Sequence, residues 1–371
     1  MTWPPLRDEL RGVEPYGAPQ LDVPVCLNVN ENPYAPPPDV VADITAAVSE
    51  AATTLNRYPD REAEALRADL ASYLGPAAGF PLRSEQVWAA NGSNEVLQQI
   101  CQAFGGPGRR ALGFEPSYSM HRLIALGTAT GWVAESRRDD FTLGPAEAAA
   151  AVRRHRPTIT FLCSPNNPTA TALAPRVIDE VCTAAEEVDG IVVVDEAYGE
   201  FAHAGTPSAL TVLPQQPRLI VTRTMSKAFA LAGARVGYLA SAPEVIDALR
   251  LVRLPYHLSA VTQAVARTAL RFQDELLGTV EAVKQQRDRI VTEIRARGLI
   301  AVDSDANFVL FGRFDDAPHV WQQLLDRSVL VRDVGLPGWL RVTAGLPEEI
   351  DAFLVALDES LAGAPVGAGV A

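Results

Sequence analysis

From about residue 33 to residue 250, helical patterns alternate along the chain with short apolar segments. Residues 190–194, a β-branched run that begins at a glycine, are the clearest of these segments, and residues 158–163 form a second. Continuous apolar runs of this length are typical of parallel strands that are buried on both faces. The alternation therefore predicts an α/β fold, with a mainly parallel sheet covered by helices on both faces.

The rest of the chain is expected to divide around this sheet. Residues 1–32 are proline-rich and irregular, which predicts an N-terminal arm packed against a smaller domain. Residues 33–250 would form the large domain, and residues 251–361 a long helical stretch, over residues 262–297, followed by a small α+β domain. Residues 362–371 are of low complexity and are expected to be disordered.

Polar residues follow the predicted strands at the edge where open α/β sheets bind ligands. Asp195 and Tyr198 stand where the run 190–194 ends, and Asn167 lies in a proline-bounded turn after residues 158–163. A carboxylate at this edge can pair with a protonated ring nitrogen of a cofactor. Both features also have ordinary interpretations, because an aspartate can cap a helix and an asparagine turn can be a plain polar turn.

Lys227 stands in a run of small hydroxyl residues that includes Thr224 and Ser226, and Arg235 follows about two helical turns on. A lysine amine can form a Schiff base with an aldehyde cofactor such as pyridoxal 5′-phosphate (PLP). Hydroxyls and a guanidinium nearby can hold the phosphate. Taken alone, however, a Ser-Lys pair is more often solvated surface.

Residues 87–100 read as a strand, a glycine-containing turn and an amphipathic helix. The turn contains Gly92, Ser93 and Asn94. The first amides of a helix lack intrahelical partners and can bind a phosphate. Ser93 or Asn94 could equally be a plain helix N-cap.

Four of these segments, residues 91–95, 164–168, 195–198 and 226–230, occur together in one order. In order and approximate spacing they resemble the fold-type I, PLP-dependent aminotransferases. The chain looks most like the histidinol-phosphate aminotransferase family, in its actinobacterial branch. The resemblance extends from Leu6 to about Leu357 and so covers nearly the whole chain.

The resemblance implies roles for the cofactor residues. Lys227 would hold PLP and move a proton between the substrate and the cofactor, and Asp195 would pair with the pyridine nitrogen. Asn167 and Tyr198 would bind the ring's 3′ oxygen, and Tyr118 would stack on the ring. The phosphate would be held by the segment around Gly92, Ser93 and Asn94, and by Thr224, Ser226 and Arg235.

The resemblance also implies a homodimer, in which Tyr58 reaches the phosphate of the neighbouring subunit. Without the resemblance, Tyr58 would be interpreted as a turn residue packed beside Pro59. Arg341 and Arg332 match the arginines that bind substrate anions, and a planar guanidinium suits that role. Arg332 could instead pair with Asp333.

Tyr16 and Asn30 match positions of the family that close over the substrate. Two residues depart from the family's pattern. Ala170 stands where glycine is usual, and alanine tolerates a positive φ poorly if the turn requires one. Ala234 stands where leucine is common, which is expected to loosen the packing under Arg235.

Charge and composition exclude several kinds of partner. The net charge is −13 and the sequence has no basic block, which argues against nucleic acid and anionic membranes as partners. Anionic substrates must therefore be bound by local arginines. The four cysteines and five histidines show no metal-ligand spacing, which favours a reduced, cytoplasmic protein without a metal.

The activity that the resemblance implies is transamination in histidine biosynthesis. L-Histidinol phosphate and 2-oxoglutarate would be converted to imidazole-acetol phosphate and glutamate. An aromatic aminotransferase, or a secondary-metabolism paralogue with another donor, would share the cofactor residues. A PLP-dependent phosphothreonine decarboxylase and a non-catalytic PLP-binding protein are the remaining alternatives.

Overall fold

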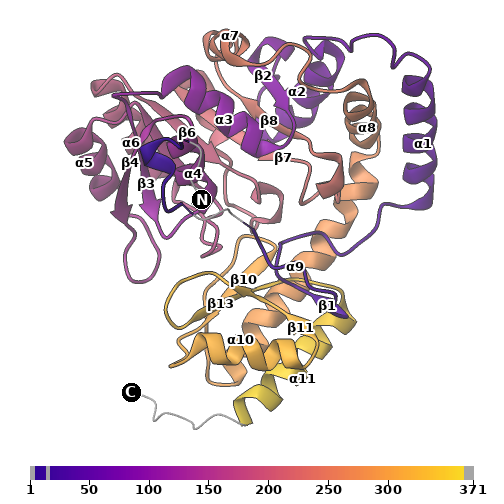
Figure 1. The fold of residues 1–371 in the computed structure, drawn as a ribbon, viewed down its shortest axis with the longest axis vertical. Helices are drawn as coiled ribbons and strands as arrows, with labels where there is room; N and C mark the ends of the chain where they lie inside the picture. The colour runs from indigo at the N-terminus through magenta and orange to yellow at the C-terminus, as the bar shows by residue number, and fades with distance from the viewer. Residues whose placement is uncertain (1–4, 14–16, 363–371) are drawn as a thin grey trace.

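A computed structural model describes residues 5–13 and 17–362 of the chain. At its centre is a seven-stranded sheet of order β2-β8-β7-β6-β5-β3-β4 (Figure 1). The strands are β2 (Val87–Ala90), β3 (Arg110–Glu115), β4 (Gly131–Ser136), β5 (Ile159–Cys163), β6 (Ile191–Asp195), β7 (Leu219–Thr224) and β8 (Gly237–Ala240). Strands β3 to β7 pair in parallel, and β8 is antiparallel to both β2 and β7. The predicted mainly parallel sheet is confirmed.

Helices cover both faces of this sheet (Figure 1). One face carries α3 (Ser93–Phe104), α4 (Ser119–Gly127) and α7 (Pro243–Val252), and the other carries α2 (Glu64–Ala78), α5 (Pro145–His155) and α6 (Pro175–Glu187). Alternate residues of β6 explain the two layers. Val192 and Val194 join the core beneath α2, α5 and α6, whereas Val193 joins the core beneath α3, α4 and α7.

A smaller layer with its own core lies below the main sheet (Figure 1). Its antiparallel sheet has the order β12-β13-β10-β9. The strands are β9 (Ile300–Ala301), β10 (Phe308–Gly312), β12 (Arg332–Asp333) and β13 (Trp339–Thr343), flanked by α10 (Ala317–Asp326) and α11 (Pro347–Ala362). The N-terminal segment joins this layer, because β1 (Val25–Cys26) pairs in parallel with β11 (Val329–Leu330).

The long helical stretch expected over residues 262–297 is two helices, α8 (Ala260–Arg271) and α9 (Gln273–Ala296), separated at Phe272. Helix α8 packs against α1 (Pro38–Ala52) and α2, whereas α9 packs against β9 and β10 of the small layer. We therefore propose that the domain boundary lies at the start of α9 and not at residue 251.

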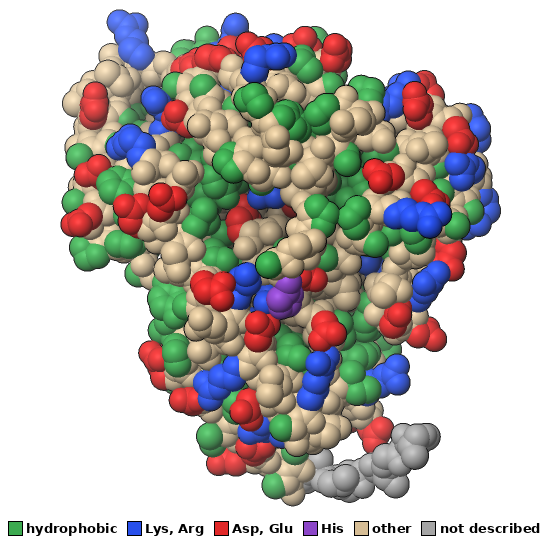
Figure 2. Space-filling view, turned by 180° about the vertical axis from the view of Figure 1, so that it is seen from behind, with side chains coloured by type: hydrophobic (Ala, Val, Ile, Leu, Met, Phe, Trp, Pro, Cys, Tyr) green, Lys and Arg blue, Asp and Glu red, His purple; other side chains and the backbone are tan. Residues whose placement is uncertain are grey.

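The expected disordered tail, residues 362–371, lies outside the described residues from 363 onward. Within the described ranges, each helix is too short or too polar to cross a bilayer. On the face that Figure 2 shows, the acidic and basic side chains are intermixed over the surface and form no single large basic patch among the described residues.

Candidate active site

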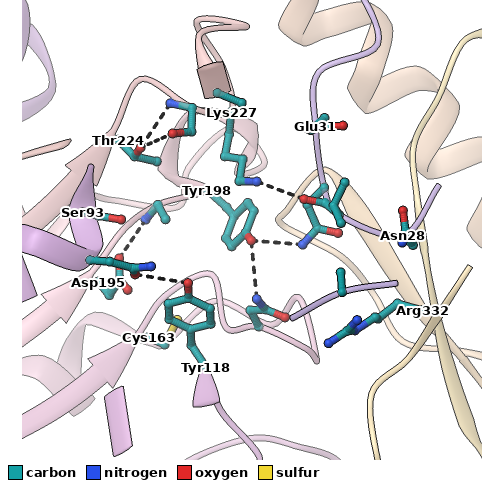
Figure 3. Close-up of a pocket in the computed structure, with 18 of the residues that line it drawn as sticks. Asn28, Glu31, Ser93, Tyr118, Cys163, Asp195, Tyr198, Thr224, Lys227 and Arg332 are labelled. Atoms are coloured by element: carbon teal, nitrogen blue, oxygen red, sulfur yellow. Dashed lines mark hydrogen bonds between the residues drawn. The ribbon is translucent and has the colours of Figure 1, made fainter. Parts of the chain in front are cut away.

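A cavity of about 410 Å³ opens where the carboxyl ends of β5, β6 and β7 meet the small layer (Figure 3). This is the edge at which α/β sheets bind ligands. The cavity brings together most of the residues predicted from the sequence. Those that line it are Asn30, Ser93, Asn94, Tyr118, Asn167, Asp195, Tyr198, Thr224, Ser226, Lys227, Arg235, Arg332 and Arg341.

Asp195 is the last residue of β6 and is almost fully buried. Its Oδ2 lies 3.0 Å from Nε2 of His121, and its Oδ1 accepts a hydrogen bond of 3.1 Å from the Thr222 hydroxyl. The segment that follows is a turn and a short 3-10 helix, Gly199–Phe201, whose N-cap is Tyr198. Asp195 is therefore not a helix cap, and its carboxylate is held at the floor of the cavity.

His121 was not predicted from the sequence. It lies on α4 and stacks on Phe161 of β5, with ring centroids 4.8 Å apart and planes 8° from parallel. The imidazole therefore braces the carboxylate of Asp195 without lining the cavity itself. No motif marks this pair, because the two residues are 74 positions apart in the chain.

Lys227 follows β7 and points into the cavity, where its Nζ donates to the Val29 carbonyl at 3.1 Å (Figure 3). Burial lowers the pKa of this amine to about 8, and the positive charges of Arg341 and Arg235 act in the same direction. Glu31 opposes this shift. A lysine that loses its proton this readily is suited to act as a nucleophile and as a base.

Tyr198 is buried, and its hydroxyl faces two amides. Nδ2 of Asn30 lies 3.0 Å away and Nδ2 of Asn167 lies 3.5 Å away. Burial raises the pKa of Tyr198 to about 12, so the phenol keeps its proton at neutral pH. Arg341, on β13, donates to Oδ1 of Asn167 at 2.6 Å and to the Asn28 carbonyl at 2.9 Å.

The start of α3 and the segment around Arg235 form a cradle on the other side of Lys227. The N-cap of α3 is Gly92, with φ 85°, and no side chain caps this helix. The plain N-cap interpretation of Ser93 and Asn94 is therefore wrong. A Cβ atom on Gly92 would lie 2.5 Å from Nη2 of Arg235, so only glycine lets the guanidinium approach.

Two hydroxyl residues complete this cradle. The backbone amide of Ser226 donates to Oγ1 of Thr224 at 3.1 Å, and Thr224 donates to Oγ of Ser226 at 3.0 Å. Amides at a helix N-terminus, hydroxyls and a guanidinium form the donor set that a phosphate needs. The cradle therefore suits a small phosphorylated ligand.

The remaining predicted residues lie around the cavity or apart from it. Tyr118 donates to Oδ1 of Asn94 at 3.2 Å. Both terminal nitrogens of Arg332 donate to the Gly17 carbonyl at 3.3 Å. Tyr58 is 79% exposed and stacks on Tyr256, 4.3 Å away between centroids, outside the cavity. Tyr16 lies outside the described residues.

The two departures noted in the sequence have structural settings. Ala170 has φ 64° and is fully buried, so the turn does require a left-handed residue at the position where glycine is usual. Ala234 ends a 3-10 helix, Ala232–Ala234, and is partly buried against the main core. Neither side chain lines the cavity.

A buried carboxylate, a lysine of low pKa, a phosphate cradle and an arginine, all at one edge of a parallel sheet, define a class of enzyme. Such a site handles amino groups through an aldehyde cofactor. Residues 23–357 match the family described as aminotransferase class I and II, and the chain belongs to this family.

Two relatives cover most of the chain. A Frankia casuarinae protein named histidinol-phosphate aminotransferase is 70% identical over 98% of this chain and 92% of its own length. A Thermobifida fusca protein of the same name is 61% identical over 95% of this chain and 94% of its own length.

Solved structures share the fold. A histidinol-phosphate aminotransferase from Sinorhizobium meliloti, in complex with pyridoxal-5′-phosphate, matches with a TM-score of 0.85 at 24% identity over 97% of this chain and 98% of its own. A Thermus thermophilus aspartate aminotransferase double mutant matches with a TM-score of 0.81 at 23% identity over 96% of this chain and 100% of its own. At these identities the likeness concerns the fold.

PLP is the cofactor of the family, and the described residues fit it. The cavity volume is in the usual range for a small-molecule site. The cradle at Gly92 and Arg235 suits the phosphate, Asp195 suits the ring nitrogen, and Lys227 suits the aldehyde. The glycine at position 92 supports the first of these matches, because a Cβ there would meet the Arg235 guanidinium.

Proposed function

We propose that this enzyme transfers the amino group of L-histidinol phosphate to 2-oxoglutarate, in histidine biosynthesis. The observation that carries the proposal is the placing of Lys227, Asp195 and Arg341 around one cavity, since these are the groups that an amino-group transfer to an anionic substrate needs. The high identity to the relative from Frankia casuarinae supports the choice of donor.

When bound, PLP supplies an aldehyde that takes up the amino group and a ring that withdraws electrons from the substrate α-carbon. Lys227 provides the amine that holds the cofactor and afterwards the base that moves the α-proton. Asp195, fixed by His121 and Thr222, would pair with the ring nitrogen. Tyr198 and Asn167 would orient the ring through its 3′ oxygen.

We propose that Arg341 and Arg332 bind the anionic end of both substrates in turn. Both guanidinium groups line the cavity on the side of the small layer, at β13 and β12. Arg341 is held in place by the Asn167 side chain and the Asn28 carbonyl. A planar guanidinium can bind a phosphate or a carboxylate through two parallel hydrogen bonds.

Changing Arg341 to lysine is expected to raise the KM of both substrates by about 10- to 100-fold, because one charge-assisted hydrogen bond of the pair is lost. Steady-state kinetics with each substrate varied in turn measures this. Arg327→Lys is the matched control, since Arg327 pairs with Glu359 at 3.1 Å on the surface and should leave both KM values unchanged. A KM change confined to one substrate would contradict a shared anion site.

The low pKa of Lys227 predicts how the apoenzyme takes up PLP. Only the neutral amine attacks an aldehyde, so the uptake rate should rise about tenfold per pH unit at low pH and level off near pH 8. Stopped-flow absorbance measures the rate, with Nα-acetyl-lysine as the reference amine, whose rate keeps rising towards about pH 10.4. If the uptake rate of the protein kept rising to this pH, as that of Nα-acetyl-lysine does, the pKa of the Lys227 amine would not be lowered.

We propose that the enzyme is a homodimer in which Tyr58 reaches the neighbouring active site. Tyr58 is 79% exposed, and Leu251 and Leu254, close in sequence to its stacking partner Tyr256, are 85% and 75% exposed. The stack of Tyr58 on Tyr256 brings these two stretches of the chain together. An exposed apolar surface of this kind marks a protein interface.

Placing a charge on this surface by the change Leu254→Glu is expected to give a monomer that binds PLP at least about tenfold more weakly, since one phosphate contact would be lost. Analytical ultracentrifugation and PLP titration measure both effects. Val355→Glu is the control, because Val355 is 58% exposed on α11, away from this surface. A dimeric Leu254→Glu protein would contradict the proposed interface.

Incubation with L-histidinol phosphate and 2-oxoglutarate tests the proposed function through the glutamate formed. L-Phenylalanine as donor tests the aromatic alternative. Release of carbon dioxide from phosphothreonine in the absence of 2-oxoglutarate tests the decarboxylase alternative. No glutamate from L-histidinol phosphate would reject the proposal. We also propose a cytoplasmic location, which the four free thiols favour.

A further inference from the structure

Asn30 is a buried residue of the N-terminal segment with a left-handed backbone. It has φ 57° and is 2% exposed. Asparagine adopts this conformation more readily than most residues. The Asn307 side chain donates to the backbone carbonyl of Asn30 at 3.1 Å, and the backbone N–H of Asn30 donates to Oγ1 of Thr343 at 3.0 Å. The backbone of Asn30 is therefore fixed by two partners on the small layer.

The same partners orient the side chain. The Thr343 hydroxyl donates to Oδ1 of Asn30 at 3.1 Å, which turns Nδ2 towards Tyr198, and Nδ2 donates to the Tyr198 hydroxyl at 3.0 Å. Nδ2 of Asn167 donates to the same hydroxyl at 3.5 Å. With its oxygen accepting two N–H groups, the tyrosine must direct its own proton elsewhere.

We propose that Asn30 is a positioning residue, whose amide turns the Tyr198 proton towards the cofactor's 3′ oxygen and makes it a stronger donor there. The inference rests on the proposed use of PLP. Hydrogen bonds in a chain polarise one another, so a phenol that accepts from Asn30 donates more strongly. Asn30 would thus act through Tyr198. Its match to a position that closes over the substrate implies direct contact with the substrate, which this role does not need.

The property that reports on this role is the protonation of the nitrogen through which Lys227 holds PLP. A strong donor on the 3′ oxygen stabilises negative charge there and so favours loss of the proton from that nitrogen. Losing the donor should make the nitrogen more basic. The pH midpoint of the visible absorption change of the PLP-loaded protein measures this basicity without any substrate.

The test compares wild-type protein, Asn30→Gly, Tyr198→Phe and the double variant, all loaded with PLP. Glycine keeps the left-handed backbone without strain and removes only the side chain. Asn30→Gly should raise the midpoint by about half to one pH unit, the size expected for one buried hydrogen bond. Tyr198→Phe should raise it further, and the double variant should match Tyr198→Phe. An unchanged midpoint in Asn30→Gly, or additive shifts in the double variant, would overturn the proposal.

Two further variants keep the test decisive if Asn30→Gly does not fold. Thr343→Val keeps the Asn30 side chain but removes the hydroxyl that accepts its backbone N–H and orients its amide, so a smaller rise is expected, and no rise would count against the proposal. Asn28→Ala is the control. Its side chain lines the same cavity but donates to the Pro19 carbonyl at 2.8 Å, so the pH midpoint should remain that of the wild-type protein. A midpoint that rose equally in Asn28→Ala would overturn the assignment to Asn30.

Failure of the proposed function gives a different result. If the midpoint shifts occur but L-histidinol phosphate yields no glutamate, the proposed donor is wrong and the role of Asn30 stands. If the wild-type protein shows no visible absorption with PLP, both proposals are overturned.

Discussion

Changing Lys227 to alanine is expected to lower the rate of amino transfer by roughly 10⁴-fold, the upper end of what a positioned proton-transfer group contributes. The loss is large because one amine has two tasks, holding the cofactor and moving the α-proton. Among the residues that line the cavity, Lys227 supplies the side-chain amine, and its low pKa lets it act near neutral pH. Single-turnover absorbance with PLP and L-histidinol phosphate measures the effect.

The sequence offers a matched control, because Lys284 is the other lysine of the chain. Lys284 pairs with Glu281 at 3.4 Å on α9, and Lys284→Ala should react at the wild-type rate. After reduction with borohydride, PLP should be found on Lys227 by mass spectrometry in both the wild-type and the Lys284→Ala protein. A Lys227→Ala protein that kept a tenth of the wild-type rate would contradict this role.

Changing Asp195 to asparagine is expected to lower the rate by about 10²- to 10³-fold, the usual cost of removing one preorganised charge from an active site. Asparagine keeps the shape of the side chain but removes the negative charge that holds a proton on the ring nitrogen. His121 and Thr222 fix the orientation of this group, so the change in charge is expected to dominate.

The measurement for Asp195→Asn is the single-turnover rate at saturating PLP, so that weaker cofactor binding is not mistaken for slower chemistry. Asp189→Asn is the control. Asp189 has φ 61°, which asparagine also tolerates, and its side chain pairs with Arg218 at 2.7 Å on the surface. Asp195→Asn reacting as fast as Asp189→Asn would show that the ring nitrogen needs no charged partner.

The main sheet and its functional edge could be predicted from the sequence because both depend on local patterns. The run at residues 190–194 forms β6 between two layers of helices, as an apolar run of this length predicts. The polar residues that follow β5, β6 and β7 meet in one cavity because parallel strands end at the same edge.

Other features could not be predicted because they depend on contacts between distant parts of the chain. His121 braces Asp195 across 74 positions, and Asn30 reaches Thr343 across 313. The separation of α8 from α9 at Phe272 follows from packing against different layers, whereas the pattern of apolar residues continues through it. Hydrophobic periodicity describes the faces of a helix but not its partners.

A comparison of amino donors shows whether the enzyme acts on L-histidinol phosphate. Wild-type protein loaded with PLP is mixed in separate runs with L-histidinol phosphate, L-phenylalanine and L-tyrosine, and the cofactor absorption is followed through one turnover. Conversion is expected to be fast with L-histidinol phosphate and slow with both aromatic donors. Fast conversion with an aromatic donor and slow conversion with L-histidinol phosphate would contradict it.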